Sequence, residues 1–274
     1  MAAAEIKNPV YSGYFSDPFA WKQDERYYAF GGGEGEPKST RSGVFPLLES
    51  RDLLHWIPMG EALTVLDPAY GTDYWAPEIA FRDGCFWMYY SLGFGDKGHH
   101  LRVAASSEAK GRYADTGALL TNPFHCPFAI DPSPFQDDDG SWYLFYASDF
   151  LDTCDGARVG TGVVVDRLIN PTQLAGEPRV VVRAHQDWQR FTENRIIYGA
   201  VYDWHTLEGP CVRKRNGRYW CLYSAGRWEN DTYGIDYAVS DHVLGPYVTG
   251  DNSSGPRVLR TIPGVLSGPG HNSV

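Results

Sequence analysis

The sequence predicts an all-β fold of the β-propeller class, on the basis of its composition and of an internal repeat. Aromatic residues make up 15% of the 274 residues, and 30 Gly and 18 Pro interrupt them. Strands favour aromatic side chains and turns favour Gly and Pro, so this composition is typical of an all-β chain. One pattern, an apolar run followed by a turn and an aromatic strand, occurs four times. Repeats of roughly 50–80 residues indicate propeller blades, whereas a two-sheet sandwich does not usually repeat in this way.

The four copies of the pattern predict the strands in chain order. They are SDPFAWKQDERYYAFGGG at 16–33, APEIAFRDGCFWMYYSLG at 76–93, IDPSPFQDDDGSWYLFYAS at 130–148 and LEGPCVRKRNGRYWCLYSAG at 207–226. Asp83-Gly84, Asp139-Gly140 and Asn216-Gly217 are typical hairpin turns between an apolar strand and an aromatic one. Second hairpins that carry a Ser follow three of the copies.

These patterns define four blades of a single domain that covers residues 1–274. The blades are expected at about 14–65, 74–120, 128–183 and 205–250. No helix of three or more turns is predicted, although 184–200 allows a turn or two. Loops are expected at 31–45, at 93–100, which includes His99-His100, and at 149–160.

Charge and hydropathy exclude several classes of partner. The chain carries 24 basic and 34 acidic residues, a net charge of −10, and an acidic surface repels the phosphate backbone of nucleic acid. No apolar run approaches the roughly 20 residues that a membrane-spanning helix needs. The first residues, MAAAEIKNPV, lack the features of a signal peptide, so we expect a cytoplasmic protein, or a secreted one if a signal peptide has been removed. The five scattered cysteines are expected to be free thiols.

Each repeat carries an acidic residue within two positions of a proline near the start of its first strand. These residues are Asp17, Glu78, Asp131 and Glu208. The first strands of propeller blades line the central channel, so acids far apart in the chain are expected to meet there. A single Asp-Pro is usually only a turn, but several acids at one place in a repeat need a reason, because clustered like charges cost stability. Glycoside hydrolysis supplies one, since it uses one carboxyl group as an acid and a second as a base or nucleophile.

The ordered set of motifs resembles glycoside hydrolase family 43, the group of arabinofuranosidases, arabinanases and β-xylosidases. The resemblance is carried by YFSDPF, YWAPEIAF, AIDPSPFQDDDGSWYLFY, LEGP and the terminal GPGHNS, over about residues 8–274. It implies a five-bladed propeller and inversion of the anomeric configuration. It also implies that Asp17 is the general base, that Glu208 is the general acid and that Asp131 adjusts the pKa of the acid. An inverting site places its two carboxyl groups about 6.5–9.5 Å apart, with water between base and sugar.

The same resemblance implies further substrate-binding residues. Trp75 is expected to offer the sugar a flat apolar face, and Glu78 is expected to be a buried structural or substrate-orienting acid. His271 in GPGHNS corresponds to the histidine at the channel centre, where it contacts water or a calcium ion. No cofactor is required, and a Ca²⁺ site reached from His271 through water is the one metal candidate, although calcium prefers oxygen ligands.

The chain departs from the family pattern at its C-terminal end. A fifth blade would begin at about residue 261, but Val274 follows His271 by three residues, so this blade is expected to be incomplete. A C-terminal peptide fragment or a second copy of the chain could complete it. No residue matches the pocket arginine that the family draws from this region.

The predicted function is that of an inverting glycosidase that releases arabinose or xylose from plant-derived poly- or oligosaccharides. The three long loops favour an exo-acting α-L-arabinofuranosidase with an arabino- or xylo-oligosaccharide substrate. A β-xylosidase or endo-1,5-arabinanase of the same family remains an alternative. A non-catalytic glycan-binding propeller is the other, although retention of all three acids speaks against it.

Overall fold

A computed structural model describes residues 9–33 and 43–274, and these residues form an all-β fold. Three 3-10 turns, at Pro68–Tyr70, Cys154–Gly156 and Asp187–Gln189, are the helical elements of this part of the chain. The last of them lies where the sequence allowed a turn or two of helix. Among the described residues, no helix has the length and apolar character needed to cross a membrane. The five cysteines are free thiols, as predicted.

The first two groups of strands are four-stranded antiparallel sheets in chain order. The first sheet contains β1 (Ser16–Gln23), β2 (Arg26–Gly32), β3 (Gly43–Ser50) and β4 (Trp56–Thr64). The second sheet contains β5 (Asp73–Arg82), β6 (Cys85–Phe94), β7 (Lys97–Ser106) and β8 (Ala114–Leu119). The predicted loop at 93–100 is therefore wrong, because β6 and β7 continue into it and leave a tight turn at Gly95-Asp96. Most of the predicted loop at 31–45 lies outside the described residues.

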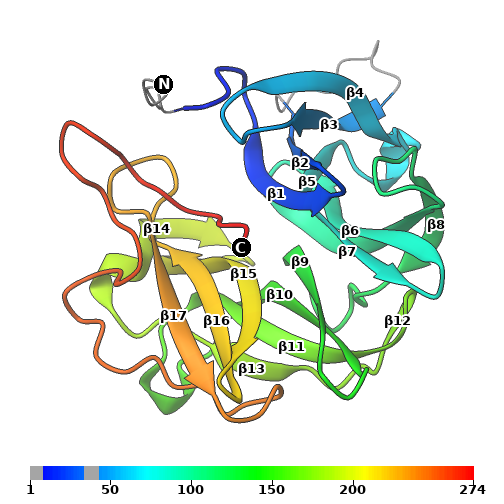
Figure 1. The fold of residues 1–274 in the computed structure, drawn as a ribbon. Helices are drawn as coiled ribbons and strands as arrows, with labels where there is room; N and C mark the ends of the chain where they lie inside the picture. The colour runs from blue at the N-terminus through cyan, green and yellow to red at the C-terminus, as the bar shows by residue number, and fades with distance from the viewer. Residues whose placement is uncertain (1–8, 34–42) are drawn as a thin grey trace.

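The remaining strands form one nine-stranded sheet. Its first half contains β9 (Ala129–Gln136), β10 (Trp142–Phe150), β11 (Gly160–Asn170), β12 (Gln173–Leu174) and β13 (Arg179–Val182). Its second half contains β14 (Arg190–Ile197), β15 (Ala200–Arg215), β16 (Arg218–Ala225) and β17 (Gly234–Ser240). Figure 1 shows these halves and the two smaller sheets following one another around a central region, into which the C-terminal segment runs.

A short parallel pairing of β11 with β15 joins the two halves, which the sequence predicted as separate blades. The paired residues are Gly160 with His205 and Thr161 with Thr206. A Cβ atom at Gly160 would lie 1.9 Å from the His205 carbonyl oxygen, so only glycine permits this approach of the two backbones. The sixteen-residue β15 also extends beyond the predicted repeat and supplies the pairing edge.

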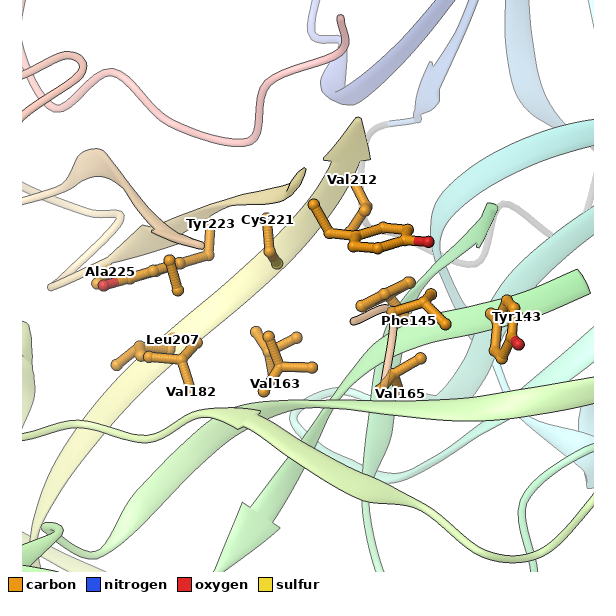
Figure 2. Packing of buried hydrophobic residues seen from close by; sticks show 14 of the residues in the cluster. Tyr143, Phe145, Val163, Val165, Val182, Leu207, Val212, Cys221, Tyr223 and Ala225 are labelled. Carbon is orange, nitrogen blue, oxygen red and sulfur yellow. The ribbon is translucent and has the colours of Figure 1, made fainter. Parts of the chain in front are cut away.

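Buried aromatic and aliphatic side chains hold the sheets together. In the nine-stranded sheet, side chains of β10, β11, β15 and β16 pack against one another, as Figure 2 shows. Phe145, Val163, Leu207 and Tyr223 are fully buried in this cluster. Burial of each such side chain contributes about 1.5–3 kcal/mol, which holds the strands that carry the candidate site in fixed positions.

One strand of every group, β1, β5, β9 or β15, contains the same backbone irregularity. A residue with positive φ precedes a proline at Asp17 (49°), Ala76 (47°), Asp131 (57°) and Gly209 (57°), and the pairing register shifts there. Such bulges bend a strand and redirect its side chains, and they are enriched next to active sites. The prediction that the four acids occupy equivalent strand positions is therefore wrong. Asp17 and Asp131 are themselves the bulged residues, whereas Glu208 directly precedes the bulged Gly209 and Glu78 follows the bulged Ala76 by two positions.

The chain after β17 is irregular. Between Thr261 and Val274 the regular pairing is limited to one bridge, between Ile262 and Leu266, so the start of a fifth blade does not form a strand here. This segment instead lies against the other groups. The Ala20 amide donates to the Ser273 hydroxyl at 3.1 Å, and the His271 amide donates to the Ser224 hydroxyl at 2.6 Å. The terminal GPGHNS motif therefore joins β1 to β16.

Candidate active site

A cavity of about 880 Å³ contains five of the six predicted site residues. Its lining includes Asp17, Trp75, Asp131, Glu208 and His271, which come from β1, β5, β9, β15 and the C-terminal segment. Asp131 is 7% exposed, and the side chain of Asp17 is 30% exposed. The bulges in the first strands thus bring acids from three groups to one partly solvated space.

The base candidate Asp17 is paired with His271. Their Oδ1 and Nδ1 atoms lie 3.1 Å apart. Burial alone would raise the pKa of Asp17, but the charge and hydrogen bond of His271, with a bond from Ser16, hold it below its usual value. Burial opposes the charge on His271, yet Asp17 and Asp131 raise the pKa of its imidazole to about 10. At neutral pH the pair is therefore an ionised carboxylate and an imidazolium.

The acid candidate Glu208 has the opposite electrostatic character. Burial and then the neighbouring charge of Asp131 raise its pKa to about 8. Asp131 is held next to it, because the amide of Gly209 donates to its Oδ2 at 2.8 Å. Burial, assisted by the charge of Asp17, also raises the pKa of Asp131. The pKa of Asp17 is thus lowered and the pKa of Glu208 is raised, so at neutral pH Asp17 is ionised and Glu208 is protonated. Two carboxyl groups that differ in this way can serve as a base and an acid.

Tyr233 is a site residue that the sequence did not reveal. Its hydroxyl donates to Glu208 Oε1 at 2.6 Å, and its side chain lines the cavity. The GPGHNS motif runs directly over it, since a Cβ atom at Gly270 would lie 1.8 Å from the Tyr233 ring. Tyr233 therefore requires a glycine at position 270, which is 37 residues later in the chain. The residues around Tyr233 carry no pattern that would predict its place in the site.

Trp75 is supported from behind by a second missed residue. The ring of His99 stacks on the Trp75 ring with centroids 3.8 Å apart, and His99 is completely buried. Burial lowers the pKa of His99 to about 4, so its imidazole is neutral, and its Nε2 lies 2.8 Å from the Gly95 carbonyl oxygen. The stack positions one face of Trp75 and leaves the tryptophan at the wall of the cavity.

Glu78 is not among the residues that line the cavity. Its carboxyl group shares a hydrogen bond with the Ser133 hydroxyl and is close enough to His271 and Asp131 for their charges to affect its pKa. Burial raises its pKa to about 7. Glu78 is half-buried, and its two predicted roles, structural and substrate-orienting, both stay predictions.

The predicted calcium site stays a prediction. The described residues contain no group of three or more His, Cys, Asp or Glu side chains arranged to hold a metal ion. His271 is protonated beside Asp17, and an imidazolium has no lone pair for direct ligation, so its contact with an ion would run through water, as the sequence predicts.

A protonated acid and an ionised base that face one cavity on an all-β scaffold are the functional groups of a glycoside hydrolase. The family model of glycosyl hydrolases family 43 matches residues 6–274, and the chain belongs to this family.

Known relatives agree with this assignment. The crystal structure of a thermostable family-43 glycoside hydrolase matches with a TM-score of 0.81 at 30% identity, and covers 98% of this chain and 82% of that one. A β-D-galactofuranosidase of Aspergillus niger is 25% identical over 280 residues, which are 97% of this chain and 72% of the relative. An extracellular endo-α-(1→5)-L-arabinanase of Bacillus subtilis is 25% identical over 245 residues, 85% of this chain and 67% of its own.

Proposed function

We propose that the protein is an inverting glycosidase that releases arabinose or xylose units from plant-derived poly- or oligosaccharides, with exo-acting α-L-arabinofuranosidase as the first activity to test. The observation that carries this proposal is the opposite protonation of Asp17 and Glu208 in one cavity. Family membership and the names of the relatives support a carbohydrate substrate. Exo action is favoured by three long loops in the sequence analysis, but one of them, 93–100, is a tight hairpin. The loops therefore support exo action less strongly than the sequence suggested.

In the proposed reaction, Asp17 removes a proton from water as the water oxygen attacks the anomeric carbon. Glu208 donates its proton to the glycosidic oxygen as the bond from that oxygen to the anomeric carbon breaks. The charge of His271 keeps Asp17 ionised and orients it, since the two side chains lie 3.1 Å apart. Asp131 keeps Glu208 protonated by charge repulsion. Trp75 presents an apolar ring to the bound sugar.

We also propose that the strand groups are blades of a five-bladed propeller. Four groups carry a residue of positive φ before a proline in the strand that bears the acid, and the C-terminal segment has Gly268 (54°) before Pro269, although Phe45, Gly245 and Gly255 show the same pair elsewhere. The C-terminal segment also bridges the first and last groups, because it bonds to both β1 and β16. This arrangement supports a fifth position around the axis.

The test is hydrolysis of 4-nitrophenyl α-L-arabinofuranoside and 4-nitrophenyl β-D-xylopyranoside by the wild-type protein and by the variants Glu208→Gln and Asp17→Asn. We expect release from one of the two substrates, and a loss of at least about a hundredfold in both variants, as when a positioned acid or base is removed. Proton NMR of the first-formed sugar is expected to show the inverted anomer. Equal activity in wild type and variants would refute the proposed roles.

Two alternatives have their own readouts. The B. subtilis relative is named an endo-arabinanase, so release of oligosaccharides from linear arabinan without activity on either aryl glycoside would support an endo-arabinanase. Binding of arabino- or xylo-oligosaccharides without release of any sugar would support a non-catalytic glycan-binding protein.

A further inference from the structure

The C-terminal segment is bonded to β16 at the residue that pairs with the acid candidate. The amide of His271 donates to the Ser224 hydroxyl at 2.6 Å. Ser224 is fully buried, and in the pairing of β15 with β16 it lies directly opposite Glu208. One serine therefore connects the strand that carries the acid candidate with the segment that carries the partner of the base candidate.

This bond determines where the ring of His271 can lie. From the held backbone the imidazole reaches Asp17, and its Nδ1 lies 3.1 Å from the carboxylate Oδ1. The ring also lies close to Gly209, where a Cβ atom would be 3.2 Å from Nδ1. A side chain that is held at its amide, at its ring nitrogen and against a glycine has little freedom to move, as a group that orients a reacting residue must.

The base candidate depends on this ring for its orientation. Asp17 lies at the bulge of β1, and its side chain shares hydrogen bonds with its neighbour Ser16 and with His271 at the other end of the chain. We infer that Ser224 is a positioning residue of the proposed base, which holds the backbone of His271 and thereby orients the carboxylate of Asp17 toward the attacking water. This inference rests on the proposed roles of Asp17 and Glu208.

Serines at the corresponding place in two other repeats lack this contact. The aromatic strands of the second and third repeats carry Ser91 and Ser148 near their ends. Ser91 is fully buried, and within the part of the chain that the structure describes its hydroxyl has no hydrogen-bond partner. The Oγ atom of Ser148 lies 3.3 Å from the Sγ atom of Cys126. The fold therefore accepts a serine here without any bond to the site, and the bond of Ser224 to His271 needs a separate reason.

Neighbouring contacts hold the C-terminal segment independently of Ser224. The Ala20 amide donates to the Ser273 hydroxyl at 3.1 Å. Gly270 lies against the ring of Tyr233, which a Cβ atom would approach to 1.8 Å. Because these contacts remain when the Ser224 hydroxyl is removed, Ser224→Ala is expected to shift His271 locally and to leave the segment in place.

The experiment compares Ser224→Ala with Ser240→Ala in the full chain. Ser240 is the matched control, because it is 3% exposed, does not line the cavity, and accepts a backbone amide, that of His242, at 3.0 Å. Each variant thus loses one buried hydroxyl that accepts an amide, and urea unfolding verifies that both are folded. Kinetics are measured on the 4-nitrophenyl and phenyl glycosides of the sugar that the wild type releases, because 4-nitrophenolate leaves with less need of a proton than phenolate.

We expect kcat of Ser224→Ala to fall by about tenfold or more while KM changes by less than about twofold, because the orientation of a base matters in the transition state rather than in binding. The loss should be equal for the two leaving groups, since both reactions need the attacking water. Ser240→Ala should leave kcat within about twofold of wild type. A larger loss on the phenyl glycoside would place the effect at Glu208, and equal losses in the two variants would indicate a structural role. Either result would overturn the inference.

A spectroscopic measurement separates this inference from the proposed activity. The side chain of His271 is 13% exposed, so in protein labelled with ¹⁵N at histidine its Nδ1 proton, bonded to Asp17, is expected as a downfield NMR signal that His271→Asn lacks. The signal should shift or disappear in Ser224→Ala and persist in Ser240→Ala. An unchanged signal in Ser224→Ala would overturn the inference whether or not the wild type is active. The expected shift in a protein without glycosidase activity would instead refute the proposed activity alone.

Discussion

The hydroxyl of Tyr233 donates a 2.6 Å hydrogen bond to Oε1 of Glu208. This bond favours the ionised form of Glu208 and so lowers its pKa, in opposition to burial and to the charge of Asp131, which raise it to about 8. The acid candidate is thus controlled by two neighbours that act in opposite directions, and each can be removed by a nearly isosteric substitution.

Replacement of these two neighbours is expected to move the alkaline limb of the pH–rate profile in opposite directions. The proposed reaction requires a protonated Glu208, so activity is expected to fall as pH rises through about 8. Tyr233→Phe removes a contact that lowers the pKa of Glu208, so the limb moves to higher pH. Asp131→Asn removes a charge that raises this pKa, so the limb moves to lower pH. The measurement is kcat/KM against pH.

Tyr247→Phe is the control for this pair, because Tyr247 donates to the Val243 carbonyl rather than to an acid of the site. Its alkaline limb should coincide with that of the wild type. Shifts of both site variants in the same direction would contradict the assigned couplings.

Removal of the ring behind Trp75 is expected to weaken substrate binding. His99→Ala deletes a fully buried imidazole that stacks on Trp75, so the tryptophan loses its support. We expect KM to rise more than kcat falls, and the free energy of unfolding to drop by about 2–5 kcal/mol, as for other large-to-small core substitutions. Substrate kinetics and urea unfolding measure the two effects. His100→Ala, next along β7, is the control, and an unchanged KM in His99→Ala would show that Trp75 needs no support.

The half-buried acid Glu78 is expected to make stability depend on pH. Its folded pKa is about 7, above the ordinary value of 4.5, because burial favours the neutral form. Its contribution to the free energy of unfolding is therefore fully present below pH 4.5 and is lost as pH rises through 7. Glu78→Gln lacks this term, so relative to wild type it should gain up to about 3 kcal/mol between pH 4.5 and 8.

Urea unfolding at several pH values tests this expectation. Glu193→Gln, at a carboxylate on the surface whose side chain is 59% exposed, is the control. Parallel stability curves for Glu78→Gln and wild type would refute the buried-acid assignment.

A buried charge network is expected to hold the irregular segment after β17. Asp236 is fully buried, and it accepts from Arg257 Nε at 2.6 Å, from the side-chain Nδ2 of Asn252 at 2.7 Å and from the Tyr223 hydroxyl at 3.1 Å. Asp236→Ala leaves the arginine without its carboxylate, and such a loss costs about 3–5 kcal/mol. Thermal or urea unfolding should show it.

Asp241→Ala provides the comparison, because Asp241 pairs with Arg218 on the surface. A loss of about 1 kcal/mol or less is expected there. Similar losses in the two variants would contradict the role of the Asp236 network.

The sequence by itself determined the all-β class, the hairpins of the four repeats and the acids that stand within two positions of a proline. These features depend on neighbours within a few residues, such as the turn at Asp139-Gly140, and local chemistry suffices to predict them. The resemblance of the ordered motifs pointed to the family that the family model then matched.

The tertiary structure alone decided which acids share a cavity and what protonation each one holds. Glu78 falls outside the lining, Tyr233 and His99 enter the site without a local signal, and Gly160 allows two predicted blades to join into one sheet. A pKa depends on burial and on charges nearby in space. The relevant partners, such as Asp17 and His271, lie at opposite ends of the chain, so spacing within the sequence carries no record of them.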